Sequence, residues 1–538
     1  MTGRLRRRWL AGLLAAGAGG VALTRRAAGA AAPRQADVFP PQPGAHRVEL
    51  DIDTRLPGTP VNRRVLGSNV QWVDGGDNLL GADDRFDPAM LALVRQLGPT
   101  VLRYPGGAQS DAYHWERGLG AQAGRGANEH VNARKPQPTR MGTREFLEVC
   151  EATGALPLVT LNLASGSPEE AARWLRATNI ARMTSSITGR PLPRVAYWEL
   201  GNEPYLTEER PDLAVLPAEF ARRANRFIAA LRALEPQAQI GLPLTSDRRN
   251  GIPVTHQFGF TRTVLAGLTE RIDFASLHDA YLPFGGPGPG GRPADPAALY
   301  WGAMAGTRAI EADFAEMQAL IAAARPGLPP LPFAITEYQG LFTLGQGATD
   351  DWVASPAAAL YVADALRLFA STPQVLLANQ WSLSANWRFG AIHAGRFPRP
   401  VFTAMALIGE ALQGQRLPVA WRGETIATAG IGRVAPVAAL PLVESLACRD
   451  GALLRVALIQ KDPRRGAQGL LRLAGSRVTG ARLQTWSCDD VLDARDDRPL
   501  FQRREAALAA PPASATPVAF TLPPASLGLL TLNLAPAA

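Results

Sequence analysis

Residues 195–205 read VAYWELGNEPY, and this stretch decides how the fold is interpreted. Its first four residues favour a strand, and the chain then turns abruptly polar at Glu199, Asn202 and Glu203. A buried strand that ends at a working surface has this composition, because the strand fixes the backbone and polar residues follow where it emerges. We therefore take Glu203 as the first candidate for a catalytic residue.

Short apolar segments like this one alternate with longer amphipathic segments through most of the chain. The apolar segments predict strands at residues 65–69, 101–104, 156–162, 195–201, 240–242, 274–278, 333–336 and 376–381. Apolar residues at three- and four-residue spacing predict helices at residues 88–97, 144–153, 168–178, 218–234, 307–324 and 356–371. Eight strands that alternate with helices close a parallel barrel, so we predict an α/β fold with a (β/α)8 TIM barrel.

The alternative architecture is an open doubly wound sheet. That fold would carry a glycine-rich phosphate loop after its first strand, and residues 65–74 contain no such loop. After a final helix expected at residues 402–412, short β-rich runs separated by turn-forming residues predict a C-terminal antiparallel β-sandwich. A strand predicted at residues 46–53 precedes the barrel and is a candidate to join that sandwich. The sandwich either packs against the barrel or serves as a carbohydrate-binding module.

The N-terminal segment has the composition of an export signal. Residues 1–30 contain six arginines and no acidic residue, and an apolar run occupies residues 9–23. The sequence RRRWL at residues 6–10 resembles a twin-arginine signal and predicts a periplasmic or extracellular location, with an uncleaved N-terminal anchor as the alternative. The predicted division is a signal at residues 1–32, a leader and strand at 33–64, a barrel at 65–415 and a sandwich at 416–538.

Charge, hydropathy and cysteine content argue against several other classes of protein. The net charge of +9 falls to +3 without those six arginines, and the other basic residues are scattered, so we expect no nucleic-acid partner. No later segment has 18 consecutive apolar residues, so we expect no stable membrane insertion after signal removal. The histidines are dispersed and no HExxH motif occurs, so we expect neither a metal nor a cofactor. Cys150 is predicted to lie in the core, and Cys448 and Cys488 are candidates to pair.

Two glutamates are predicted to reach the same rim of the barrel. Glu203 follows the fourth strand, and Glu337, in the sequence AITEY, follows the seventh. Active sites in this fold form at the carboxyl ends of the strands, so the two carboxyl groups are expected to lie together. Glycoside hydrolysis needs such a pair, because one carboxyl group protonates the leaving oxygen while the other attacks or stabilises the anomeric carbon. Glu199 faces the same side as Glu203 by strand alternation and is its competitor, with a charge-balancing role as the favoured alternative.

These motifs resemble those of the retaining glycoside hydrolases of clan A, in which Asn-Glu closes the fourth strand and a second Glu closes the seventh. Within the clan, the segments LRYPGG at residues 102–107, YHW at 113–115 and MGTREFL at 141–147 are most similar to the α-L-arabinofuranosidases of glycoside hydrolase family 51. The chain departs from the family pattern at Ala108, where the family often has Asn, and at Tyr338, where it often has Trp. Pro204-Tyr205, directly after Glu203, is more similar to other clan A families. All these positions are expected at the sugar-facing rim.

The resemblance implies roles for the residues around the two glutamates. Glu203 would be the acid/base and Glu337 the nucleophile, with carboxyl groups about 5–5.5 Å apart as in retaining enzymes. Asn202 would bind the substrate 2-hydroxyl, and Arg103 would keep the nucleophile ionised, because an adjacent cation lowers a carboxyl pKa. The residues implied to bind substrate are Asn202, Arg103, His278, Tyr281 and Trp381.

Three of these residues also have structural interpretations. Arg103 is alternatively a structural partner of any barrel acid, His278 a rim histidine with satisfied hydrogen bonds, and Trp381 a core residue. Taken together, the sequence predicts an exported, retaining, α-L-arabinofuranosidase-like glycoside hydrolase whose partner is an oligosaccharide or polysaccharide. The alternatives are another clan A activity, such as a β-xylosidase, β-glucuronidase or endo-glycanase, and a catalytically silent glycan-binding protein.

Overall fold

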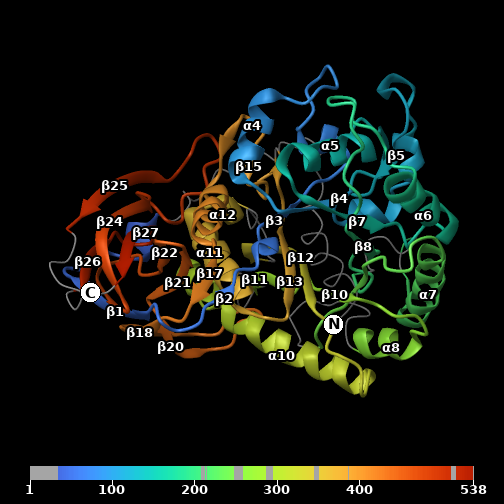
Figure 1. The fold of residues 1–538 in the computed structure, drawn as a ribbon. Helices are drawn as coiled ribbons and strands as arrows, with labels where there is room; N and C mark the ends of the chain where they lie inside the picture. The colour runs from blue at the N-terminus through green and yellow to red at the C-terminus, as the bar shows by residue number, and fades with distance from the viewer. Residues whose placement is uncertain are drawn as a thin grey trace, which may run out of the picture.

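The computed structural model describes residues 34–206, 213, 215–247, 259–285, 295–343, 351–385, 387–509 and 517–536. The predicted export signal at residues 1–32 lies outside this part of the chain. Within it, no helix combines the length and the apolar character needed to cross a membrane. Figure 1 shows a barrel surrounded by helices beside a β-rich domain in which the first strand lies among the last ones.

A closed ring of eight parallel strands forms the barrel, as the alternating pattern predicted. Neighbours in this ring pair in parallel, and the pairing of the sixth strand with the seventh completes the closure. The eight strands are β3 (Gly67–Asn69), β4 (Val101–Tyr104), β7 (Leu156–Leu161), β8 (Tyr197–Leu200), β9 (Ile240–Pro243), β10 (Phe274–Ser276), β12 (Phe333–Thr343) and β13 (Val375–Gln380). The predicted TIM barrel is therefore confirmed.

The sixth strand of the barrel is interrupted, which the sequence pattern did not predict. Near its start β12 pairs with β10, and further along it pairs with a separate strand, β11 (Ala280–Gly285). Residues 277–279 belong to neither strand and include His278. The interruption therefore releases a histidine from the ladder at the carboxyl rim of the barrel.

The helices around the barrel begin at recognisable signals. In α6 the Ser167 hydroxyl accepts a hydrogen bond from the backbone amide of Glu170, and Pro168 occupies the first turn. The described helices of the barrel region that exceed seven residues are α4 (Pro88–Leu97), α5 (Thr143–Thr153), α6 (Pro168–Leu175), α7 (Pro217–Leu234), α8 (Phe260–Gly267), α9 (Pro296–Met304), α10 (Gly306–Ala324), α11 (Pro356–Ser371) and α12 (Pro400–Ala411). Helices α8 and α9 were not predicted; α9 is apolar on most sides, so it lacks the amphipathic spacing on which the prediction relied.

Two sheets make up the β-sandwich. The smaller sheet has the order β18 (Ala420–Gly423), β1 (Ala45–Asp53), β23 (Gly466–Ala474) and β26 (Val518–Leu522). The larger has the order β2 (Thr59–Pro60), β17 (Gln415–Leu417), β21 (Val443–Asp450), β22 (Leu453–Gln460), β27 (Ser526–Pro536), β24 (Ser476–Ser487) and β25 (Gln502–Leu508). Alternate residues of both sheets, such as Val48 and Leu50 of β1, form a core between them.

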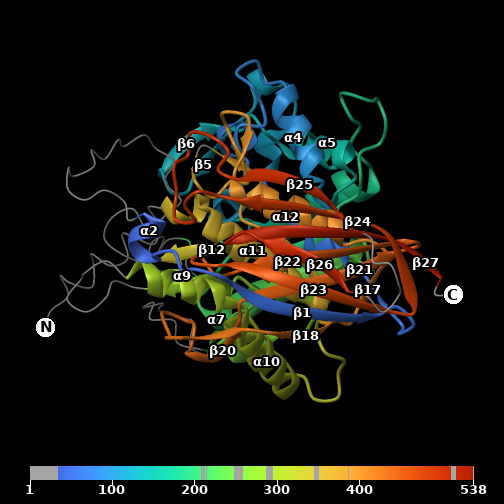
Figure 2. The same cartoon turned by 90° about the vertical axis from the view of Figure 1, so that its left-hand side faces the viewer.

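The early strand β1 lies inside the C-terminal sandwich. It pairs in parallel with β23 over its whole length and in antiparallel fashion with β18. Figure 2, seen from the sandwich side, shows blue β1 running beside the red and orange strands from the chain end. The sandwich is therefore antiparallel except for this one pairing, among the strands that the structure describes.

The sandwich packs on the barrel through α11 and α12, which contact β21 and β22 and lie between the two domains in Figure 1. Residues of β22 alternate between two cores. Val456 and Leu458 face the interior of the sandwich, whereas Ala457 and Ile459 join the core of the barrel helices. One strand thus contributes to both hydrophobic cores.

The candidate disulfide between Cys448 and Cys488 does not form. Cys448 lies on β21 and Cys488 directly follows β24, and both carry free thiols. Because β22 and β27 lie between these strands, the cysteines are separated by three strand spacings, about 14 Å. A disulfide requires Cα atoms within about 7 Å. Cys150 is a free, buried residue of α5, as predicted.

A buried ion pair crosses the interface between barrel and sandwich. Lys461, directly after β22, has no exposed surface, and its Nζ lies 2.6 Å from the Asp364 carboxylate of α11 and 3.0 Å from the Met304 carbonyl oxygen. Arg367 also contacts Asp364, at 2.6 Å. Although burial acts to raise it, Arg367 and Lys461 together lower the pKa of Asp364 to about 2.

Replacement of this lysine tests how strongly the two domains are joined. We expect Lys461→Met to destabilise the protein by about 3 kcal/mol, because removal of one partner leaves a buried carboxylate poorly compensated. Arg367 remains as a partner and keeps the loss from being larger. The midpoint of thermal unfolding measures the effect. Lys135→Met is the matched control, because Lys135 is the other lysine of the chain and is exposed. Equal midpoints for the two variants would contradict the prediction.

Candidate active site

The two predicted glutamates lie side by side at the carboxyl rim of the barrel. One carboxylate oxygen of Glu203, one of Glu337 and a ring nitrogen of His278 all lie within 4.8 Å of one another. Glu203 follows β8, as predicted, whereas Glu337 lies within β12, which extends to Thr343. Prediction of the strand end at residue 336 was therefore wrong, although the expected proximity of the two carboxyl groups is observed.

A local irregularity in β12 directs two successive side chains into the site. The pairing of β12 with β13 shifts register between Ile335 and Tyr338. In a regular strand Thr336 and Glu337 would point to opposite faces. Here both face His278: the Thr336 hydroxyl lies 2.9 Å from its Nε2, and a Glu337 oxygen lies 3.9 Å from its Nδ1. Bulges of this kind are a known means of re-aiming side chains beside active sites.

Glu203 has a backbone conformation that is uncommon for its residue type. Its φ of +38° lies in the left-handed region, as does the φ of +81° at Gly201 two residues earlier. The turn is closed by a hydrogen bond from the Leu206 amide to the Glu203 carbonyl oxygen at 2.8 Å. Unfavourable backbone of this kind persists where the surroundings hold it, and it clusters at functional sites.

Arg103 of β4 contacts four other residues of the site. Its guanidinium group is fully buried and lies 2.6 Å from the Glu199 carboxylate and 2.8 Å from the Glu337 carboxylate. The same group donates to the side-chain oxygens of Asn202, at 2.8 Å, and Asn69, at 3.0 Å. Arg103 thus joins β4 to β3, β8 and β12. It pairs with a buried barrel acid, Glu199, and it also contacts Glu337, so both interpretations given for it from the sequence fit these contacts.

Glu199, the competitor of Glu203, is enclosed in that network. Its side chain has no exposed surface, and its carboxylate accepts hydrogen bonds from Thr160, at 2.6 Å, and Thr336, at 2.7 Å, besides Arg103. Burial alone would raise the pKa of Glu199, but Arg103, His278 and the two threonines lower it below its usual value. The carboxylate is therefore a fixed buried charge with its hydrogen bonds satisfied, which suits the charge-balancing role predicted for it.

Both ring nitrogens of His278 have partners: Nδ1 faces the two glutamates and Nε2 faces Thr336. Its Nδ1 lies 3.0 Å from a Glu203 oxygen and 3.9 Å from a Glu337 oxygen, and its Nε2 lies 2.9 Å from the Thr336 hydroxyl. Because Thr336 donates its hydrogen to the Glu199 carboxylate, the Thr336 oxygen must accept from Nε2. Burial acts against the charged ring, but Glu337 and Glu203 outweigh it and raise the pKa of His278 above its usual value.

Both oxygens of the Glu337 carboxylate are held. Arg103 contacts Oε1, and the Tyr281 hydroxyl, at the start of β11, donates to Oε2 at 2.6 Å. Burial raises the pKa of Glu337, although His278, Arg103 and the Tyr281 hydrogen bond act in the opposite direction. Arg103 therefore contacts the carboxylate as expected, but the pKa moves upward rather than downward because desolvation dominates.

Trp381 and Tyr338, which the sequence placed near the sugar, are both buried. Trp381 follows β13 and is 7% exposed, with its ring 5.9 Å from that of Trp387 in an edge-to-face arrangement. The loop after β4 packs directly on it: a Cβ added to Gly107 would lie only 2.6 Å from the Trp381 ring. Tyr338 is fully buried against Phe369, so its expected place at the sugar-facing rim is wrong.

Several polar residues of the site were not predicted from the sequence. Asn69 stands at the end of β3, so the strand-end rule that identified Glu203 was sufficient to find it. The hydroxyl groups of Thr160 and Thr336 are recognisable as site residues only once their strands are adjacent, because single threonines are common in barrel strands.

Glu203, His278 and Glu337 are also close enough for each to offer one ligand atom to a metal ion. The sequence predicted no metal site, because the three positions are far apart in the chain and form no ligand motif. Their atoms already form hydrogen bonds with protein groups such as Arg103 and Thr336.

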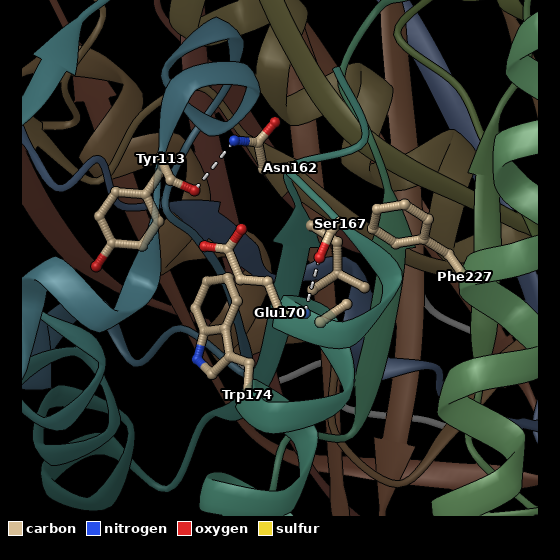
Figure 3. A pocket seen from close by; sticks show the side chains of 8 residues that line it. Tyr113, Asn162, Ser167, Glu170, Trp174 and Phe227 are labelled. Atoms are coloured by element: carbon tan, nitrogen blue, oxygen red, sulfur yellow. Dashed lines mark hydrogen bonds between the residues drawn. The ribbon is translucent and has the colours of Figure 1, made fainter. Parts of the chain in front are cut away.

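A small cavity lies beside the end of β7 (Figure 3). Its space of about 10 Å³ is enough for one water molecule and far too small for a sugar. It is lined by Tyr113, Leu161, Asn162, Ser167, Glu170, Ala171, Trp174 and Phe227. None of the site residues described above lines it.

Comparison with known proteins finds α-L-arabinofuranosidases. The sequence model of the alpha-L-arabinofuranosidase 1 domain matches residues 93–259, a segment that contains Arg103 and Glu203 but not Glu337. Alpha-L-arabinofuranosidase C of Emericella nidulans is 32% identical over 224 residues, which cover 38% of this chain and 43% of that protein. An exo-alpha-(1->6)-L-arabinofuranosidase of Bifidobacterium longum is 29% identical over 253 residues, or 44% of this chain and 47% of that protein. The chain thus spans less than half the length of these curated relatives.

Solved structures share the fold over a longer range. The GH51 alpha-L-arabinofuranosidase of Thermotoga petrophila superposes with a TM-score of 0.73 at 21% identity, covering 90% of this chain and all of that one. A family 44 xyloglucanase of Paenibacillus polymyxa superposes with a TM-score of 0.58 at 14% identity, covering 90% of this chain and 99% of that one. The chain is therefore similar to the family 51 α-L-arabinofuranosidases, in sequence over residues 93–259 and in fold over about nine-tenths of its length.

Proposed function

We propose that this chain is a retaining glycoside hydrolase in which Glu203 is the acid/base and Glu337 the nucleophile. The observation that carries the proposal is the pair of carboxyl groups at one rim of the barrel, with oxygens within 4.8 Å of each other. Retaining enzymes have carboxyl groups about 5–5.5 Å apart, whereas inverting enzymes need about 6.5–9.5 Å to admit a water molecule between base and sugar.

The two carboxyl groups have different surroundings, as their different roles require. Arg103 and Tyr281 hold the buried carboxylate of Glu337. The side chain of Glu203 is more exposed, at 23%, and faces His278. His278 Nδ1 lies at hydrogen-bonding distance from Glu203 and so orients its carboxyl group.

In the first step Glu337 attacks the anomeric carbon while Glu203 gives its proton to the glycosidic oxygen, which leaves as an alcohol. Arg103 and Tyr281, one on each oxygen, fix the plane of the attacking carboxylate. In the second step Glu203, now a carboxylate, removes a proton from water as the water attacks the glycosyl-enzyme ester. Free sugar leaves with its original anomeric configuration, and both glutamates return to their starting states.

The preferred substrates in this proposal are α-L-arabinofuranosides of plant- or microbe-derived glycans, hydrolysed after export of the protein. The support is the match of residues 93–259 to the arabinofuranosidase domain and the names of the two relatives. A different sugar is the main competitor, because Pro204 and Tyr205 after the acid/base resemble other clan A families.

A panel of aryl glycosides tests the substrate. We expect 4-nitrophenyl α-L-arabinofuranoside to be hydrolysed at least about tenfold faster than the corresponding β-D-xyloside or β-D-glucuronide, since pocket shape distinguishes related sugars by such factors. Faster release from a β-glycoside would replace the proposed substrate by another clan A substrate. Oligosaccharide binding without turnover of any glycoside would instead favour the silent glycan-binding alternative.

Azide rescue of glutamate variants tests the two assigned roles. Glu203→Ala is expected to lower kcat by about 10²- to 10⁴-fold for poor leaving groups, because general acid catalysis is lost. On an aryl glycoside with a good leaving group, which departs without a proton, azide should restore turnover by attacking the glycosyl-enzyme and give a glycosyl azide with the substrate's configuration. Glu337→Gly should be inactive alone and give the inverted azide. Nuclear magnetic resonance of the products identifies the anomer, and the opposite pairing of variant and anomer would reverse the roles.

The pH dependence of kcat/KM tests the Tyr281 contact. Tyr281 donates to the Glu337 carboxylate and so lowers its pKa, against the upward effect of burial. We expect Tyr281→Phe to raise the pKa of Glu337 further, and the acidic limb of the profile to move upward by about one pH unit, as loss of one hydrogen bond to a charged group implies. In the matched control Tyr338→Phe the limb should stay in place, since the Tyr338 hydroxyl has no partner among the described residues. An unmoved limb in Tyr281→Phe would contradict this assignment.

A further inference from the structure

Thr336 links the buried carboxylate of Glu199 to the ring of His278. Its hydroxyl donates to Glu199 Oε1 at 2.7 Å and lies 2.9 Å from His278 Nε2, while its carbonyl oxygen accepts from the Asn69 side chain at 2.9 Å. Strands β9 and β10 lie between β8 and β12 in the ring, so the contact with Glu199 crosses the barrel interior. Thr336 has no exposed surface and cannot touch a bound sugar. Any effect it has on the reaction must pass through its neighbours.

The carboxylate of Glu199 decides which groups donate in this chain of contacts. Its other oxygen, Oε2, accepts from Arg103 and from Thr160, each at 2.6 Å. A carboxylate only accepts, so Thr336 must give its one hydroxyl hydrogen to Glu199, and its oxygen is left to accept from His278. The hydrogen on Nε2 is thus fixed by a charge that lies on β8, across the barrel from Thr336.

The other ring nitrogen of His278 faces the glutamates. Nδ1 lies 3.0 Å from Glu203 Oε1 and 3.9 Å from Glu337 Oε2. With one hydrogen held on Nε2, Nδ1 of the neutral ring accepts from a protonated Glu203, and Nδ1 of the charged ring donates to an ionised Glu203. Burial opposes the charged ring, but Glu337 and Glu203 raise the pKa of His278 above its usual value. The ring therefore has a suitable hydrogen bond for each of the two forms between which an acid/base alternates.

We propose that Thr336 is a positioning residue for the acid/base, because it keeps a hydrogen on His278 Nε2 and so keeps Nδ1 available to Glu203 in both steps. This inference rests on the proposed function. A valine at position 336 would have the same shape but could not accept from Nε2. The ring would then carry its hydrogen on Nδ1 or turn away from Glu203, and the carboxyl group would lose its alignment for proton transfer.

Leaving groups of different quality test this role. The substrates are the phenyl and dinitrophenyl glycosides of the sugar that the wild type hydrolyses fastest, and kcat/KM is measured for each. For Thr336→Val we expect about a tenfold loss on the phenyl glycoside, as loss of one hydrogen bond implies. The loss on the dinitrophenyl glycoside should stay within about twofold, because that leaving group departs without a proton. Thr336→Ser keeps the hydroxyl group and should return the phenyl value to within about threefold of the wild type.

Thr160→Val is the matched control. Thr160 is as deeply buried as Thr336 and donates to the same carboxylate, but its hydroxyl faces Glu199 Oε2 rather than the His278 ring. We expect the two valine variants to lower the midpoint of thermal unfolding to a similar extent, since each removes one hydrogen bond from Glu199. Only Thr336→Val should show the selective loss on the phenyl glycoside. The same selective loss in Thr160→Val, equal losses on both substrates in Thr336→Val, or no recovery in Thr336→Ser would overturn this inference alone.

Nuclear magnetic resonance of the wild-type protein with isotope-labelled histidine tests the hydrogen placement without a folded Thr336 variant. The chain has six histidines, and loss of one signal in His278→Gln identifies the ring. We expect Nε2 of His278 to carry a hydrogen, and a bare Nε2 would overturn the inference whatever the turnover. Absence of wild-type turnover on all glycosides would overturn the proposed function and the positioning role with it.

Discussion

The buried guanidinium group of Arg103 is the interaction on which the rest of the site depends. A cation with no exposed surface is tolerated only where carboxylates and side-chain oxygens surround it, and here Glu199, Glu337, Asn202 and Asn69 supply them. Asn69 lies on β3, Glu337 on β12, and Glu199 and Asn202 on or directly after β8, while Arg103 itself lies on β4. The strands must therefore close in one register for the charge to be compensated, so the geometry of the carboxyl pair follows from closure of the barrel.

Two departures from regular β-structure give the site its shape. The break between β10 and β11 frees His278, and the register shift in β12 turns Thr336 and Glu337 toward the same network. Both lie on adjacent strands, so the histidine and the glutamate meet across one pairing. A perfectly regular barrel would present alternate residues only, and the chain of contacts from Glu199 through Thr336 to His278 would be missing.

The sequence was sufficient for the barrel and for the two glutamates, because these follow from local patterns. Apolar periodicity located the eight strands, and the strand-end rule then selected Glu203 and Glu337. Local patterns could not predict the break before β11. The break depends on pairing between strands, because β12 pairs with β10 near its start and with β11 further along. The cysteine pairing failed for the same reason, as it required the order of strands in the sheet.

Strand β1 has a consequence for the order in which the molecule can be completed. Its residue Ala45 pairs with Gly466, so a segment made early in synthesis finds its neighbour only when nearly the whole chain exists. The smaller sheet therefore cannot assemble while the barrel is still being synthesised. Until β23 has been made, the apolar face of β1 stays unburied. Long-range pairing of this kind slows folding and exposes an unpaired strand edge for longer. A truncation anywhere before β23 would thus leave β1 without the strand it pairs with along its whole length, however complete the barrel itself.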